Sequence, residues 1–153
     1  MDAEKKTLYF AYGSNMDTEQ MYFRCPEAVL EGKAKLTDYK FALDEKGYAT
    51  VIPAEGHSVT GLIWSVNGKD EASLDYYEGV AKGCYKRAAV STVLESGTSA
   101  EALVYLSLRG ENLGVRVENY MPRIHDAAEK FGFGESYCRM LRRIELGEIN
   151  EDI

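Results

Sequence analysis

The sequence predicts an α+β fold: a mixed, mostly antiparallel, barrel-like sheet of about six or seven strands with flanking helices. Strand-like segments separated by turn residues fill the chain up to residue 108, and helical spacing of apolar residues dominates only beyond it. Regular alternation of strands and helices is absent. The length of 153 residues suits a single domain over 1–153, with its core expected over about 7–147.

The first predicted elements are a strand and a short helix. Residues 8–12 are aromatic and compact, and they run into Gly13-Ser14-Asn15, residue types that favour tight turns. Asp17 can cap the helix that follows, with Gln20 as its third residue, and Pro26 ends it. A strand therefore leads through a small polar loop into a capped helix.

Further strands are predicted over 28–42, 48–53 and 59–66, with a turn at Gly47 between the first two. Gly61 lies inside the third of these strands. A glycine there predicts a bulge or a close approach of another backbone.

The second half begins with a short helix over 69–78 that ends at Gly79. Strands over 85–94 and 101–108 then surround a turn at Gly97. Helical periodicity follows from Val117 to Phe131 and again up to Leu146, and we expect both helices on one side of the sheet. The acidic residues 148–153 are expected to fray.

Charge and hydropathy exclude several classes of function. Eighteen basic against 25 acidic residues would repel nucleic acid, and Arg139, Arg142 and Arg143 are expected to form solvated ion pairs with Glu135 and Glu145. No apolar run approaches the roughly 20 residues of a membrane span, and the first residues do not resemble a secretory signal. We expect a cytoplasmic protein that binds neither nucleic acid nor membrane.

The cysteines and histidines do not suggest a metal. Cys25, Cys84 and Cys138 are widely separated, and neither His57 nor His125 stands at metal-ligand spacing from them. These cysteines fit a reducing compartment.

Two positions break local rules and are candidates for chemistry. The loop at Tyr12-Gly13-Ser14-Asn15 can point backbone N–H groups into a concavity that accepts a carboxylate or an oxyanion, although a simple turn explains it as well. Glu78 ends a helix, one turn after Asp75, beside Tyr76, Tyr77, Val80 and Tyr85. The helix dipole, the nearby carboxylate and desolvation would all raise its pKa, so that it could accept and return a proton; a solvated helix-end glutamate is the alternative.

Residues 9–16, YFAYGSNM, resemble the YGSN motif of the γ-glutamylcyclotransferase superfamily, which includes the AIG2-like proteins. Later segments are similar to successive segments of that family in the same order: Arg24 and Pro26, 32–41, 49–53, 59–64 and LDYYEGV at 74–80. The resemblance covers about residues 7–108 well and the C-terminal helices more loosely. Leu43 to Tyr48 looks short beside the animal enzymes.

The resemblance implies a cofactor-independent enzyme, of acyltransferase or lyase type, that cyclises a small γ-glutamyl substrate to 5-oxoproline. It assigns Glu78 as the acid/base residue and places the glutamyl group on backbone N–H groups of the loop. The substrate-binding residues that it implies are Tyr12, Gly13, Ser14, Asn15, Met16, Tyr85, Tyr105 and Tyr120. No metal is implied, and a homodimer is an open expectation.

Two alternatives remain at this point. One is a non-catalytic binding protein on the same fold, in which Glu78 pairs with a ligand's ammonium. The other is a hydrolase or amidotransferase that uses Cys84, although no histidine stands in a recognisable Cys-His arrangement.

Overall fold

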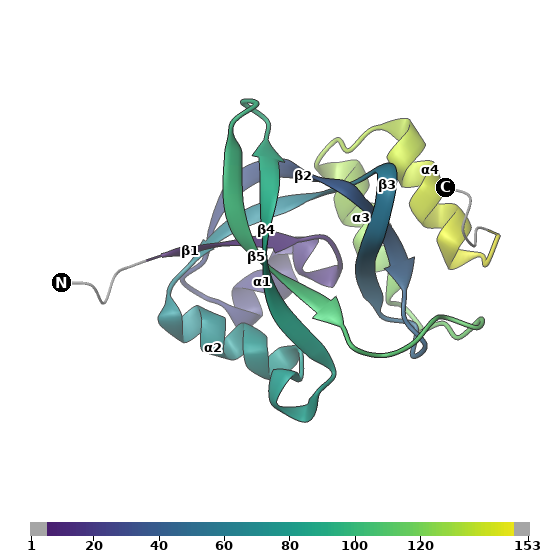
Figure 1. Ribbon diagram of the computed structural model, residues 1–153, viewed down its shortest axis with the longest axis horizontal. Coiled ribbons are helices and arrows are strands. Elements are labelled where there is room, and N and C mark those ends of the chain that lie inside the picture. The colour runs from purple at the N-terminus through teal and green to yellow at the C-terminus, as the bar shows by residue number, and fades with distance from the viewer. Residues whose placement is uncertain (1–5, 149–153) are drawn as a thin grey trace.

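The computed structural model describes residues 6–148, and in them five strands close into a barrel with four α-helices outside it (Figure 1). The strands follow each other around the barrel in the order β1-β3-β2-β4-β5. β1 and β5 close it as a parallel pair, and the pairs β1–β3, β2–β3, β2–β4 and β4–β5 are antiparallel. The predicted α+β fold with a mixed barrel is confirmed. The strand bounds are β1 Thr7–Ala11, β2 Val29–Leu43, β3 Ala49–Val66, β4 Tyr85–Leu94 and β5 Ser99–Ser107.

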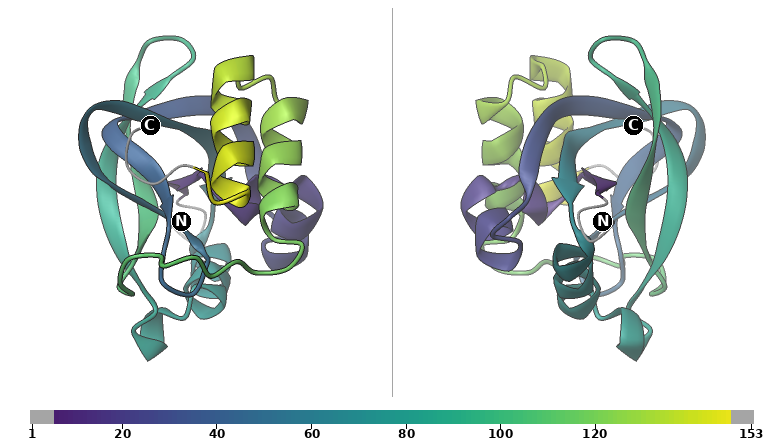
Figure 2. Two further views of the ribbon diagram at one scale, coloured as in Figure 1. Left: turned by 90° about the vertical axis from the view of Figure 1, so that its right-hand side faces the viewer. Right: turned by 90° about the vertical axis from the view of Figure 1, so that its left-hand side faces the viewer.

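The helices are α1 Thr18–Arg24, α2 Gly68–Tyr77, α3 Met121–Lys130 and α4 Glu135–Glu145, with short 3-10 turns η2 Ser14–Met16 and η3 Val80–Lys82. α3 and α4 lie side by side on one flank of the barrel, as predicted (Figure 2). Their buried Ile124 and Leu141 belong to the same core cluster as Phe10 and Trp64 of the barrel. No helix in the described part of the chain is long and apolar enough to cross a membrane.

The strand count is lower than predicted because residues 48–53 and 59–66 belong to one strand. β3 pairs with β2 on both sides of an irregularity, where the partner changes from Ser58, opposite Thr37, to Pro53, opposite Tyr39. Asp38 adopts a positive φ of 65° there. Residues 54–57 therefore bulge out of a continuous strand instead of ending it, and the described residues form five strands.

The start of α1 fixes the loop before it. Asp17 caps the helix as predicted and accepts a hydrogen bond from the Glu19 N–H at 3.3 Å. Gln20 is the third helical residue, but its side chain turns away from the cap and donates to Ser14 Oγ (2.7 Å) and Asn15 Oδ1 (2.9 Å). The first turn of α1 thereby holds the small polar loop after β1.

The three C-terminal arginines form ion pairs as predicted, but two of them have other partners than expected. Arg139 pairs with Glu135 at 3.2 Å, whereas Arg142 pairs with Glu129 of α3, and Arg143 approaches Glu148 at 3.8 Å. Glu145 instead binds His125 Nε2 at 2.9 Å. The contacts of Arg142 and Glu145 join α3 to α4, and all three arginines are engaged with carboxylates.

Gly61 makes the close approach that its position predicted. A Cβ atom on Gly61 would lie 2.5 Å from the Ala11 carbonyl oxygen and 2.8 Å from the Phe10 ring. Both neighbours belong to β1 and are buried. Only a glycine lets β3 pack this tightly against β1.

We therefore expect Gly61→Ala to destabilise the protein by about 2 kcal/mol, because the methyl group overpacks rigid neighbours. Gly68→Ala is the matched control, since nothing lies within 4 Å of its Cβ position. Urea unfolding of both variants measures the difference. Equal stability of the two would show that β1 can move aside.

Candidate active site

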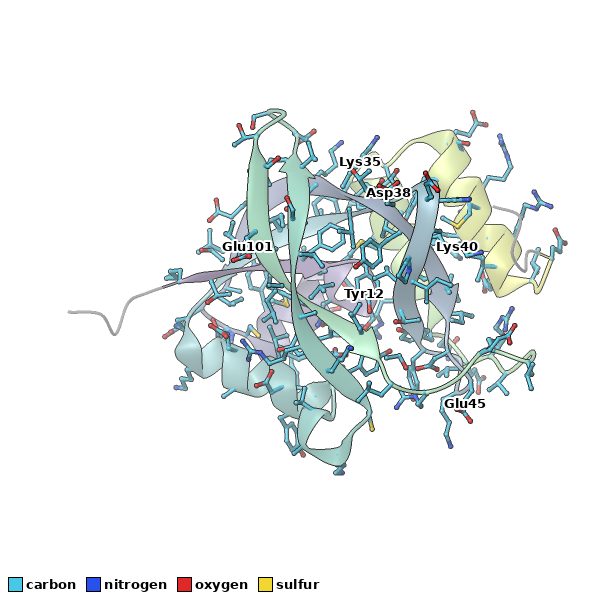
Figure 3. All side chains as sticks on the ribbon, viewed as in Figure 1. Tyr12, Lys35, Asp38, Lys40, Glu45 and Glu101 are labelled. Carbon is cyan, nitrogen blue, oxygen red and sulfur yellow. The ribbon has the colours of Figure 1, made fainter. Side chains whose placement is uncertain are left out.

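Two neighbouring cavities lie where β1, α2, β4 and the segment before α3 meet. The inner cavity has a volume of about 30 Å³, and the outer one about 570 Å³. Ser14, Glu78, Tyr85 and Tyr120 line both of them. The inner cavity is otherwise lined by Tyr9, Tyr12, Gly13, Asn15, Ala49 and Tyr105. Tyr12, one of these lining residues, lies in the interior of the molecule (Figure 3).

Glu78 stands at the junction of the two cavities. It follows the last residue of α2, and its N–H donates to the Leu74 carbonyl at 2.9 Å. Gly79 then takes a left-handed conformation with φ 67°, which ends the helix and sends the chain into η3. Within residues 6–148 the Glu78 carboxyl group has no hydrogen bond and no ion pair.

Burial raises the pKa of Glu78 to about 7, and the charges of Arg24 and Arg109 only partly oppose this. Asp75, expected to add to the rise, is engaged elsewhere: it accepts from the Tyr105 hydroxyl at 2.6 Å and from Arg87 at 3.0 Å. Desolvation is therefore the cause of the shift, and the carboxyl group can change its protonation state near neutral pH.

The loop after β1 offers two backbone donors. Met16 N–H donates to the Gly13 carbonyl at 3.0 Å, and Asp17 N–H to the Ser14 carbonyl at 3.0 Å. The N–H groups of Ser14 and Asn15 have no partner among the described residues. Both residues line the inner cavity, so their unpaired N–H groups are candidates to bind an anion there.

Met16 lies apart from the other predicted loop residues. Its side chain is fully buried in the core, its N–H stays within the loop, and it lines neither cavity. Tyr12, Gly13, Ser14 and Asn15 do line the inner cavity.

The three predicted tyrosines near Ala49 present hydroxyl groups of two kinds. Tyr12 donates to the Tyr105 carbonyl at 2.6 Å and Tyr85 to the Ala49 carbonyl at 2.6 Å, so each keeps lone pairs to accept a hydrogen bond. Tyr120 instead accepts from the Ala49 N–H at 2.9 Å and keeps its proton to donate. Burial raises the pKa of all three phenols, which are therefore neutral. The wall suits a ligand that carries both an ammonium and a carboxylate.

Tyr9 is a cavity residue that the sequence analysis missed. Its hydroxyl accepts from Asn15 Nδ2 at 3.0 Å, while Asn15 Oδ1 accepts from Gln20 (2.9 Å) and Arg24 (3.2 Å). Two donors on Oδ1 fix the orientation of the amide, so Tyr9 must accept and retains its own proton for the cavity. The sequence did contain one indication: a tyrosine in a buried strand needs a polar partner for its hydroxyl group, so Tyr9 could have been expected near polar residues.

Arg109 was also missed, because only the fold brings it to the site. Its Nε donates to Asp44 Oδ2 at 2.9 Å, a residue 65 positions away. The guanidinium lies 5.4 Å from the Tyr48 ring centroid and 5.2 Å from that of Tyr85. Arg109 therefore forms a cationic wall of the outer cavity.

Cys84 lines the outer cavity, but none of the residues lining either cavity is a histidine. His125 is held by Glu145 between α3 and α4, and His57 lies in the bulged part of β3. A Cys-His pair for nucleophilic catalysis is thus absent from both cavities. In the described part of the chain no group of three or more histidine, cysteine or carboxylate side chains is placed to hold a metal.

Comparison with known proteins identifies the family of this chain. A family model for gamma-glutamyl cyclotransferase, AIG2-like, matches residues 9–125. Gamma-glutamylcyclotransferases from Bos taurus and Homo sapiens are 31% and 30% identical to the chain. The alignments cover 95% and 98% of this chain and 85% and 87% of those proteins.

Solved structures agree with the sequence relatives. A gamma-glutamyl cyclotransferase structure matches with a TM-score of 0.82 at 29% identity, over 97% of this chain and 91% of that one. An uncharacterized protein from Homo sapiens matches with a TM-score of 0.85 at 30% identity, over 98% and 92%. The chain belongs to the AIG2-like γ-glutamyl cyclotransferase family, as its motifs indicated.

The raised pKa of Glu78 has a consequence for stability. The folded protein holds a proton on Glu78 up to about pH 7, whereas the unfolded chain loses it near the ordinary value of 4.5. Between these values the native state binds more protons, so stability falls as pH rises through this window.

Glu78→Gln removes this dependence and should be the more stable protein at pH 8, by about 3 kcal/mol, with the advantage disappearing below pH 4.5. Melting temperatures of both proteins from pH 4 to 9 provide the measurement. A constant difference across this range would mean that Glu78 titrates normally.

Proposed function

We propose that this protein cyclises γ-glutamyl amides to 5-oxoproline and a free amine or amino acid, with Glu78 as general acid and base. The observation that carries the proposal is the unpaired Glu78 carboxyl group, desolvated to a pKa of about 7, between the two cavities. A group with such a pKa can both take up and return a proton at neutral pH.

The unequal cavities fit the two halves of such a substrate. The ammonium and carboxylate end of the glutamyl part would reach towards the inner cavity, where acceptors and donors alternate, with its methylene chain at the junction of the two cavities. The departing amine would extend into the outer cavity of about 570 Å³ beside Arg109. The scissile amide would then lie next to Glu78.

The first step is ring closure. The Glu78 carboxylate takes a proton from the substrate's α-ammonium, and the freed nitrogen attacks the γ-carbonyl carbon. The carbonyl oxygen becomes an oxyanion, which the unpaired N–H groups of Ser14 and Asn15 would stabilise. Holding the chain folded, with nitrogen close to the carbonyl carbon, supplies a further part of the acceleration.

The second step is release of the amine. Protonated Glu78 gives its proton to the departing nitrogen as the carbon–nitrogen bond breaks and the carbonyl re-forms. The resulting carboxylate then takes the proton left on the ring nitrogen and passes it to the amine, which leaves as an ammonium. Both protons lost by the ring nitrogen thus travel through one carboxyl group, which ends as it began.

A small γ-glutamyl compound as partner, a cytoplasmic location and a homodimer are further parts of this proposal. The acidic balance of the chain supports the absence of nucleic acid among its partners. Size-exclusion chromatography with light scattering tests the dimer directly.

We expect Glu78→Gln to lower kcat/KM at least about a hundredfold, because it keeps the shape of the side chain and removes the base. In the wild type, kcat/KM should rise with pH and level off above about 7, where Glu78 is a carboxylate. Release of 5-oxoproline from γ-glutamyl dipeptides, glutathione and γ-glutamyl amines is the measurement. Glu101→Gln, an exposed glutamate of β5, is the control and should behave as wild type.

A near-normal rate in Glu78→Gln would remove the mechanism. Survival of activity in that variant together with inactivation by thiol alkylation would favour Cys84. Thermal stabilisation by a γ-glutamyl ligand without turnover would identify a binding protein on this fold.

A further inference from the structure

α2 carries Glu78 at its C-terminal end, yet apolar contacts hold this helix weakly. Of its ten residues, Leu74 is the one buried apolar side chain, and Asp70 is the other buried residue. Tyr76 points outward, with 76% of its surface exposed. Because a helix needs an apolar face to anchor it by burial, polar contacts must fix the position of α2.

One arginine on the barrel supplies such contacts. Arg87 of β4 donates from one nitrogen to Glu71 Oε1 at 2.6 Å and from the other to both oxygens of Asp75 at 3.0 and 3.1 Å. Glu71 and Asp75 are four residues apart, so they lie on one face of α2 in successive turns. The rigid guanidinium group of Arg87 therefore binds two successive turns of α2, which lies below the β4–β5 hairpin in Figure 1.

The strand beside Arg87 reinforces this grip. Tyr105 of β5 is the direct cross-strand partner of Arg87, and its hydroxyl donates to Asp75 Oδ1 at 2.6 Å. Tyr105 also lines the inner cavity, where its carbonyl accepts from Tyr12. Asp75, one turn before Glu78, is thus held by two neighbouring strands of the cavity wall.

The three charged side chains are partly shielded from water. Their exposed fractions are 38% for Arg87, 19% for Glu71 and 32% for Asp75, against 60% and 89% for the surface pair Arg139–Glu135. Charge-assisted hydrogen bonds in such surroundings are stronger than those of isolated surface pairs.

We propose that Arg87 is a positioning residue: by clamping Glu71 and Asp75 of α2 to the barrel wall, it holds the Glu78 carboxyl group in the site and away from water. The proposal rests on the acid/base role proposed for Glu78. Arg87 itself lines neither cavity, so it acts through the helix.

Loss of the clamp should hydrate Glu78. Burial is the main cause of its raised pKa, so water reaching a loosened last turn of α2 moves that pKa from about 7 towards 4.5. The charged residues that line the outer cavity are all retained when Arg87 is replaced. They are Arg24, Asp75, Lys82 and Arg109. The other titratable groups that line the two cavities are Tyr9, Tyr12, Tyr48, Tyr76, Tyr77, Cys84, Tyr85, Tyr105 and Tyr120.

The test follows Glu78 in Arg87→Met by carboxyl ¹³C NMR titration, with the signal assigned through Glu78→Gln. We expect the Glu78 titration to move down by about one pH unit, and kcat at pH 8 to fall about tenfold with little change in KM. Arg87→Lys should recover part of both effects because it retains one ion pair. Arg142→Met, which removes an ion pair between α4 and α3, is the control and should leave the Glu78 titration in place.

An unmoved or upward-shifted Glu78 titration in Arg87→Met overturns the proposal, even if the variant is less stable. Should Arg87→Met not fold, Arg87→Gln, which also lacks the charge, takes its place under the same criterion. Absence of turnover in the wild type would count against the proposed function alone, since the NMR titration reports on the clamp without any substrate.

Discussion

The whole site depends on the partial burial of one carboxyl group, that of Glu78. Among residues 6–148 no cationic group contacts Glu78, and burial raises its pKa to about 7 against the charges of Arg24 and Arg109. A salt bridge at this point would have lowered the pKa and left a weaker base. The neighbouring charges are therefore tied elsewhere, Asp75 to Arg87 and Arg109 to Asp44.

The tyrosines around Ala49, from β4 and from the segments after β1 and before α3, form a wall of fixed and neutral polar groups. Tyr12 and Tyr85 are oriented by backbone carbonyls, and Tyr120 by the Ala49 N–H, so that few hydroxyl groups can rotate when a ligand arrives. Preorganised donors and acceptors stabilise developing charge without having to reorient. The end of α2 thus carries the titrating group, Glu78, and the tyrosine wall carries the hydroxyl groups that would bind the ligand.

Local patterns predicted most of the fold, and the resemblance to a family selected the loop and Glu78 as the candidate site. Strand periodicity, the Asp17 cap and the Gly61 approach depend on neighbouring residues, and the order of motifs pointed to the loop and to Glu78. The bulge opposite Asp38 and the place of Arg109 arise from contacts between segments far apart in the chain, which a single sequence does not encode locally. Asp75 was misjudged for the same reason, since its partner lies on another element.

The closure of the barrel determines when a newly made chain can acquire its cavity. β1, the first strand among the described residues, has its partners in β3 and in β5, and the parallel contact joins Tyr9 to Leu103. The last wall residue, Tyr120, follows later still. Non-local pairing of this kind delays assembly until distant segments are present. β1 can therefore pair with β3 once residue 66 has been made, whereas the cavity is complete only after Tyr120.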